Sequence, residues 1–159
     1  MTRVWISAGT NVDAETNMRA AVQNLRAEFG ELVLSPVYRT KAVGFEGDDF
    51  LNMVIGIDTE LPPDQLRTRL RTIEKSLGRV RGEEKFSPRT IDLDLLTWGE
   101  LVDEAADIPR SEILRYAFVL KPLADVAPDE QHPETGESYA GIWRHFRGEE
   151  DMSLLDWDW

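Results

Sequence analysis

Alternation of hydrophobic and polar residues predicts four strands in this chain. Successive side chains of a strand point to opposite faces, so a period of two indicates a strand with one buried face. The strands are predicted over residues 3–9, 31–40 and 50–59, and within 87–99. Pro36 lies in the second of these segments and indicates an edge position or a bulge, because proline lacks the N–H that a central strand donates.

Two other segments show the three- and four-residue spacing that is typical of an amphipathic helix. The first ends before Gly30, and the second lies between Pro62 and Gly78, which suits the preference for proline at helix starts and glycine just past helix ends. The two apolar stripes are Met18, Val22, Leu25 and Phe29, and Leu66, Leu70, Ile73 and Leu77.

The order strand, helix, strand, strand, helix, strand is that of the ferredoxin-like sandwich. We therefore predict an α+β fold, a βαββαβ sandwich with an antiparallel sheet, helices on one face and the other face open, and C-terminal helical additions. The additions are one or two helices over 112–128, broken before Pro122, and a last helix over 138–146.

The length of the chain suits one domain with a proper core. We predict a single domain over residues 1–159, in which 148–159 is an acidic tail. The two tryptophans of this tail, Trp157 and Trp159, are expected to dock on the body, with exposure to a partner as the alternative.

The strand within 87–99 carries two aspartates. Asp92 and Asp94 are two residues apart and share a face, while Ile91, Leu93 and Leu95 point to the other face. Adjacent carboxylates repel each other unless water or a cation lies between them. The pattern alone leaves two interpretations open, a solvated outer face or a cation site.

The chain has a net charge of −12 and contains no cysteine. The lack of cysteine excludes disulfides, thiolate metal sites and cysteine nucleophiles. The negative charge argues against general affinity for nucleic acid or for anionic membranes. No apolar run is long enough for a signal peptide or a membrane span, so we expect a cytoplasmic protein.

One segment reverses this charge. Between Arg67 and Arg89, eight basic residues and only three acidic ones give a local net charge of +5, which leaves −17 for the rest of the chain. Arginines bind phosphate oxygens, and Mg²⁺ takes one or two carboxylates together with phosphates and water. The island therefore suggests a nucleotide site beside the aspartates, without a P-loop or G-x-G-x-x-G motif. The alternative is that these charges pair with one another, as we expect of Glu74 with Arg71 or Lys75.

Several blocks, in order between residues 3 and 128, make the chain resemble the 6-hydroxymethyl-7,8-dihydropterin pyrophosphokinase family. They are AGTN, SPVYRT, GDDFLN, GRVR, SPRTIDLDLLTWG and AFVLKPLADVAP. The element PRTIDLDLL is highly specific for that family. The resemblance implies that the β,γ-diphosphate of ATP, the co-substrate, is transferred to the hydroxymethyl group of the pterin in folate biosynthesis, with release of AMP.

The resemblance also implies roles for residues at matching positions. The catalytic set is Arg81, Arg89, Asp92 and Asp94, and the two aspartates bind two Mg²⁺ ions. The implied ATP contacts are Glu74, Arg79, Arg81, Phe86, Arg89, Leu95, Arg110 and Arg115. The implied pterin pocket is Thr40, Val43, Phe50, Asn52 and Phe118, in which the two phenylalanines stack on the ring and the asparagine bonds its polar edge. The family further implies a monomer that acts on small molecules, without a nucleic-acid or membrane partner.

The chain departs from the family pattern mainly where the nucleotide is held. The departures are Arg110 and Ser111 after Pro109, where the family has a histidine, Tyr116 in place of an arginine, Phe86 in place of tryptophan and Ala42 in place of proline. We expect retained chemistry with altered ATP affinity, in which Arg110 or Arg115 takes over the missing contacts.

Two other functions are compatible with the same fold. A catalytically silent paralogue would act as a pterin- or nucleotide-binding module, but the intact aspartates, Arg81 and Arg89 argue against it. A ferredoxin-like RNA-binding domain would present aromatic side chains on its central strands, where this chain has TIDLDLL.

Overall fold

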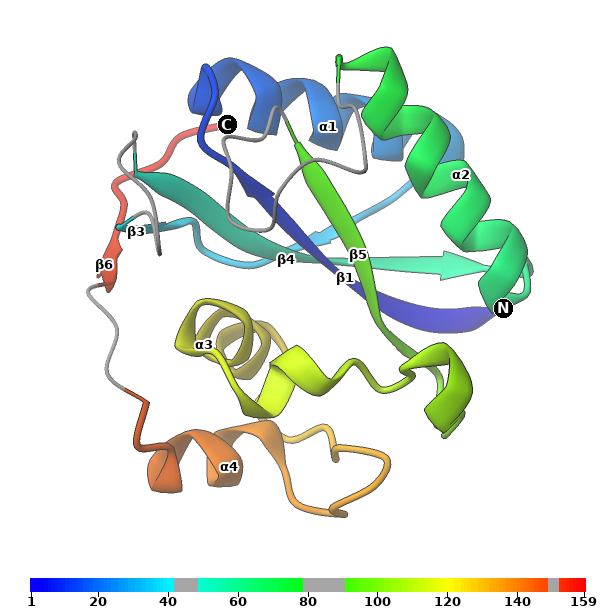
Figure 1. The fold of residues 1–159 in the computed structure, drawn as a ribbon, viewed down its shortest axis with the longest axis vertical. Coiled ribbons are helices and arrows are strands. Elements are labelled where there is room, and N and C mark those ends of the chain that lie inside the picture. The colour runs from blue at the N-terminus through cyan, green and yellow to red at the C-terminus, as the bar shows by residue number, and fades with distance from the viewer. Residues whose placement is uncertain (42–48, 79–90, 149–151) are drawn as a thin grey trace.

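The computed structural model describes residues 1–41, 49–78, 91–148 and 152–159 (Figure 1). The strands are β1 (Thr2–Thr10), β2 (Val33–Leu34), β3 (Tyr38–Thr40), β4 (Phe50–Thr59), β5 (Asp92–Trp98) and β6 (Met152–Leu154). The helices are α1 (Ala14–Phe29), α2 (Pro63–Ser76), α3 (Ala117–Val126) and α4 (Tyr139–His145), with short 3₁₀ turns η1 (Glu104–Ala106) and η2 (Ser111–Leu114). None of the helices in these ranges is long and apolar enough to cross a membrane.

The strands pair antiparallel in the order β5-β1-β4-β3-β6, and β2 also pairs with β4. The first strand thus lies between β4 and β5, as in a ferredoxin-like sandwich, and the predicted α+β fold is confirmed. The predicted strand 31–40 is interrupted at Ser35 and Pro36. There the Val54 N–H donates to the Ser35 hydroxyl at 2.8 Å, so a side chain replaces a ladder bond.

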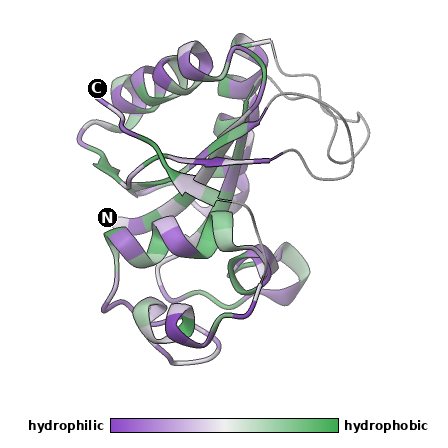
Figure 2. Ribbon diagram, turned by 90° about the vertical axis from the view of Figure 1, so that its left-hand side faces the viewer, coloured by the Kyte–Doolittle hydropathy of each residue, from purple (hydrophilic) through white to green (hydrophobic). Residues whose placement is uncertain are grey.

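Helices α1 and α2 cover one face of the sheet, with their polar sides outward (Figures 1 and 2). The α2 stripe is buried there at Leu66, Leu70 and Ile73. These residues belong to a first core, which also takes up Leu93 and Leu95 of β5. The apolar side of the aspartate strand therefore points inward, as its alternation predicted.

The opposite face is covered in part by α3, and α4 packs against α3 (Figure 1). Apolar residues of α3 form a second core with Trp5, Val54 and Leu96. The second face, expected to be open, is therefore closed where α3 packs on it. Asn52 of β4 and the two aspartates of β5 lie on this same face by strand alternation.

Helix α3 does not break before Pro122, contrary to the prediction. It runs from Ala117 to Val126 with the proline inside it and buried. An internal proline removes one helix hydrogen bond. Burial of Val119, Leu120 and Leu123 in the second core offsets that loss.

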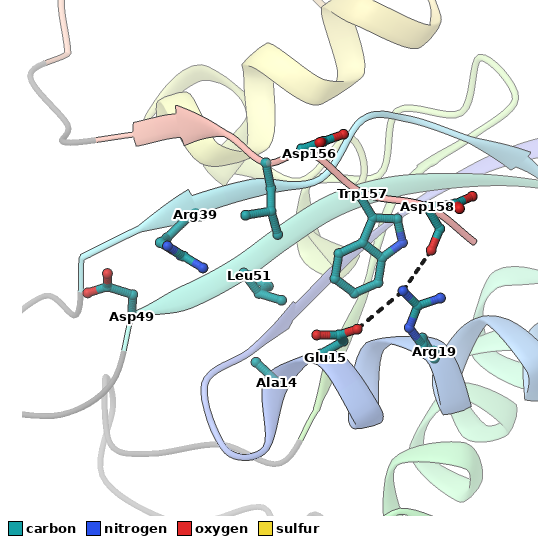
Figure 3. A pocket seen from close by; sticks show the side chains of 10 residues that line it. Ala14, Glu15, Arg19, Arg39, Asp49, Leu51, Asp156, Trp157 and Asp158 are labelled. Carbon is teal, nitrogen blue, oxygen red and sulfur yellow. Dashed lines mark hydrogen bonds and ion pairs between the residues drawn. The ribbon is translucent and has the colours of Figure 1, made fainter.

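The C-terminal residues dock on the body through Trp157. Strand β6 pairs with β3, and the Leu155 N–H donates to the Val37 carbonyl at 2.9 Å. The Arg19 guanidinium lies 4.5 Å from the centroid of the Trp157 ring and donates to the Asp158 carbonyl at 2.7 Å. Figure 3 shows this indole between the tail and α1, at the wall of a cavity of about 440 Å³. The docking expected of both tail tryptophans is thus seen for Trp157, whereas Trp159 is 48% exposed.

Replacing Trp157 with alanine is expected to lower the free energy of unfolding by about 2 kcal/mol, through lost burial and a lost cation–π contact. Trp159 is the matched control, because it is 48% exposed and its alanine variant should lose less than about 1 kcal/mol. Urea unfolding followed by circular dichroism measures both. Equal losses for the two variants would show that the docking contact contributes nothing of its own.

Candidate active site

A row of paired residues crosses three strands at one end of the sheet. Gly9 of β1 pairs with Asn52 of β4 on one side and with Asp92 of β5 on the other. Neighbouring strands lie about 4.8 Å apart, so Asn52 and Asp92 are separated by roughly 10 Å. A Cβ atom at Gly9 would lie only 3.0 Å from the Asn52 Oδ1. Because glycine has no side chain, the space above β1 between Asn52 and Asp92 stays unobstructed.

Three of the residues predicted to hold the pterin, Thr40, Phe50 and Asn52, lie together on β3 and β4. The Asn52 Nδ2 donates to the Thr40 Oγ1 at 2.8 Å, and both side chains are buried. Thr40 pairs with Phe50 across the two strands. Phe118 lies in the first turn of α3, which packs against β3 and β4. Val43 lies outside the described residues.

Tyr116, one of the departures from the family pattern, stacks on Phe118. The two ring centroids are 5.0 Å apart and the ring planes differ by 12°. Offset-stacked aromatic pairs stabilise each other beyond the area they bury. The tyrosine therefore supports Phe118 from the position where the family has an arginine.

Asp94 is more enclosed than a solvated strand face would leave it, with 7% exposure. The Arg71 Nη2 lies 3.3 Å from its Oδ1, and the Arg110 Nη2 lies 3.7 Å from its Oδ2. The expectation of an exposed pair is therefore corrected for Asp94, because these guanidinium groups reach it from α2 and from the segment before η2. Asp92 is partly exposed on the same face.

Three arginines gather around Asp94. Burial lowers the pKa of Arg67, and the charges of Arg110 and Arg71 lower it further. Burial also disfavours the charge of Arg110, but Asp94, Glu112 and Asp107 outweigh it and raise the pKa of that guanidinium. A cluster in which cations crowd one another gains from an added anion. Among the three, this gain applies to Arg67, since Arg71 already pairs with Glu74 and Asp94, and Arg110 with Asp94 and Glu112.

Sequence reasoning included Arg67 and Arg71 in the basic island, but of these three arginines it assigned an ATP contact only to Arg110. Arg67, Arg71 and Glu74 are spaced four and three residues apart and so lie on one side of α2. That spacing was the available signal. The spacing of these charged residues was overlooked because the apolar stripe of α2 lies next to them on the helix.

Glu74 is 1% exposed and lies against the backbone of β5. Its Oε2 accepts from the Leu93 N–H at 2.6 Å and from the Arg71 Nη1 at 2.5 Å. The predicted ion pair with Arg71 is confirmed. The Leu95 side chain is buried in the first core, so only its main chain can face a nucleotide.

Of the predicted nucleotide contacts that remain, Arg115 lies within the described residues. The Arg115 guanidinium lies 5.9 Å from the centroid of the Tyr116 ring, and it lines a groove with Ile142 and Phe146. Four further predictions, Arg79, Arg81, Phe86 and Arg89, lie outside the described residues, as does the departure Ala42.

The donor set at β5 suits magnesium. Within the described parts of the chain, no group of three or more histidine, cysteine or acidic side chains is arranged to hold a metal ion. Mg²⁺ does not need such a cage, because it keeps several waters and takes further oxygens from substrate phosphates. Two carboxylates on one strand face beside a cluster of arginines therefore fit a metal that is bound together with a polyphosphate.

Comparison with known proteins identifies the family to which the chain is similar. The family model described as 7,8-dihydro-6-hydroxymethylpterin-pyrophosphokinase (HPPK) matches residues 5–128. The 2-amino-4-hydroxy-6-hydroxymethyldihydropteridine pyrophosphokinase of Methylorubrum extorquens is 42% identical over 135 residues, which cover 81% of this chain and 85% of that protein. The enzyme of the same name from Bacillus subtilis is 33% identical over 158 residues, which cover 93% and 94% of the two chains.

A solved structure shows the same fold at low sequence identity. The HPPK-DHPS protein of Plasmodium falciparum, solved with pterin and p-hydroxybenzoate, superposes with a TM-score of 0.70 at 11% identity. The match covers 90% of this chain and 43% of that longer one. This likeness shows the fold, while the family model and the curated relatives show that the chain belongs to the 7,8-dihydro-6-hydroxymethylpterin-pyrophosphokinase family.

Proposed function

We propose that this chain transfers the β,γ-diphosphate of ATP to the hydroxymethyl group of 6-hydroxymethyl-7,8-dihydropterin, with release of AMP, in folate biosynthesis. The observation that carries the proposal is that Asn52 and Asp92 pair with the same residue, Gly9, from its two sides. A pterin bonded near Asn52 thus lies within one small molecule's length of a triphosphate held near Asp92. Membership of the family supports the same activity.

The chemistry asks for positioning and charge stabilisation rather than for a covalent nucleophile. The hydroxymethyl oxygen bonds to the β-phosphorus, the bond from that phosphorus to the α–β bridging oxygen breaks, and this oxygen leaves with AMP. The hydroxyl proton is released. Asn52, bonded to Thr40, fixes the edge of the pterin, so that the hydroxymethyl oxygen is aimed at the phosphate.

The metal dependence is part of the proposal. We assign Asp92 and Asp94 as ligands of two Mg²⁺ ions, which when bound neutralise the triphosphate and orient its oxygens. Arg110 and Arg67 add positive charge beside Asp94. Arg81 and Arg89 are assigned to the phosphates by their position in the family motif. Action as a monomer in the cytoplasm also remains a prediction.

The function is tested by incubating the protein with ATP, Mg²⁺ and 6-hydroxymethyl-7,8-dihydropterin and measuring AMP by chromatography. We expect AMP that depends on both the pterin and the metal, with controls lacking the pterin or containing a chelator in excess of the metal. Folded protein that binds pterin but forms no AMP would identify the silent paralogue instead.

Arg110 is expected to take over a nucleotide contact that the family makes with other residues. Its alanine variant should raise the KM for ATP about tenfold, the scale of one lost charge-assisted hydrogen bond, with little change in the KM for the pterin. Arg115→Ala is the comparison, and it should change the KM for ATP less than twofold because its guanidinium lies over Tyr116. Initial rates at varied ATP measure both. An unchanged KM for ATP in Arg110→Ala would refute this role.

A further inference from the structure

Strand β5 is an edge strand, since it pairs with β1 on one side only among the described strands. An edge strand leaves the outward N–H and C=O groups of alternate residues without a strand partner. At Leu93 both groups are satisfied by α2. The Leu93 N–H donates to the Glu74 Oε2 at 2.6 Å, and the Arg71 Nη1 donates to the Leu93 carbonyl at 3.0 Å.

Leu93 is the residue between the two aspartates. Its N–H belongs to the peptide group that follows Asp92, and its carbonyl belongs to the peptide group that precedes Asp94. Fixing both peptide groups fixes the directions in which the two carboxylates leave the strand. The ion pair between Arg71 and Glu74 closes the arrangement, and the Arg71 Nη2 also lies 3.3 Å from Asp94.

We propose that Glu74 and Arg71 are positioning residues that take the place of a neighbouring strand at β5 and hold Asp92 and Asp94 in the geometry that binds the metal. The proposal deepens the proposed function and rests on it. It assigns Glu74 to the aspartate strand instead of to ATP.

The burial of Glu74 supports this role. A carboxylate with 1% exposure is costly unless it is paired and hydrogen-bonded. Its Oε2 accepts one hydrogen bond from Arg71 and one from the Leu93 N–H of the aspartate strand. Groups of this kind, which orient metal ligands without touching the metal, typically change metal affinity by about 10- to 100-fold when they are removed.

The experiment uses the double variant Glu74→Leu/Arg71→Met, which removes a cation and an anion together. The local net charge is unchanged and Asp94 keeps Arg110 as an ion-pair partner, but the Leu93 N–H and carbonyl lose their bonds to α2, so the melting temperature is measured beside the activity. Glu74→Gln is the conservative variant, because its amide oxygen can still accept from the Leu93 N–H. Arg69→Met is the matched control on the same helix, since Arg69 pairs with Glu28 of α1.

We expect the double variant to need about tenfold more Mg²⁺ for half-maximal activity, with the KM for the pterin changed less than twofold. Binding of α,β-methylene-ATP, measured by calorimetry, should weaken with Mg²⁺ present and stay the same without it. Glu74→Gln should lie close to the wild type, and Arg69→Met should match it.

Three outcomes would overturn the proposal. An unchanged Mg²⁺ requirement in the double variant, whatever its melting temperature, would show that the pair only stabilises the fold. Equal losses of analogue affinity with and without Mg²⁺ would show that the pair contacts the nucleotide itself. Equal losses in Glu74→Gln and in the double variant would show that charge, and not the bond to Leu93, matters. Calorimetry needs no turnover, so an inactive wild type would refute the proposed function and leave this test standing.

Discussion

The substitution Asp94→Asn is expected to lower kcat by about 10²- to 10³-fold, which is the scale of losing one group that stabilises transition-state charge. The amide keeps the shape of the carboxylate and its oxygen can still accept from Arg71, but its NH₂ group cannot accept from Arg110 and it lacks the charge that binds Mg²⁺. The fold should survive, because Arg71 keeps Glu74 as a partner and Arg110 keeps Glu112. The melting temperature is therefore expected to shift by only a few degrees, about 1 kcal/mol of stability.

The measurement is AMP formation at saturating ATP and pterin, with the melting temperature of each variant as the check on folding. Asp92→Asn should show a loss of the same order. Asp107→Asn is the matched control, since this carboxylate also lies within 4.0 Å of Arg110 but is not on β5. Near-normal turnover in an Asp92→Asn/Asp94→Asn double variant would remove the basis of the metal assignment.

The substitution Gly9→Val is expected to lower kcat/KM for the pterin by about a hundredfold or more, because the valine side chain fills the space between Asn52 and Asp92. The first added carbon already lies 3.0 Å from the Asn52 Oδ1, and the two methyl groups of valine extend further above the sheet. Displacing a substrate by 1 Å typically costs about that factor. Valine favours strand backbone, so β1 itself should keep its structure.

Calorimetric binding of the pterin to Gly9→Val and Gly9→Ala tests this prediction. Gly9→Ala should be intermediate, because Asn52 has to move only a few tenths of an ångström to relieve the contact. Both variants should keep the far-UV circular dichroism of the wild type. Pterin affinity in Gly9→Val equal to that of the wild type would show that the substrate does not cross this row.

Much of the fold follows from periodicity alone. Strand β4 has the bounds that its alternation predicts, and α2 begins and ends beside its proline and glycine signals. Pro36 was expected at an edge or a bulge within one strand, whereas the segment is divided there into β2 and β3. The continuous helix through Pro122 was not foreseen, because local propensity does not include the burial of that helix in a second core.

The candidate site was predictable only in part. Alternation placed Asp92 and Asp94 on one face, and that follows from strand geometry. The burial of Asp94 did not follow from alternation. It depends on β5 being an edge strand, because only there can the Arg71 side chain of α2 extend past the edge of the sheet to Asp94. The contact of Glu74 with Leu93 is likewise a tertiary one, between residues that lie 19 positions apart. No spacing rule along one element predicts it.

Mass spectrometry of a single mixture of the protein, ATP, Mg²⁺ and 6-hydroxymethyl-7,8-dihydropterin identifies both products of the proposed reaction. We expect AMP and the pterin diphosphate ester in equal amounts. ADP with a pterin monophosphate, or AMP with free diphosphate and unchanged pterin, would contradict the proposed reaction.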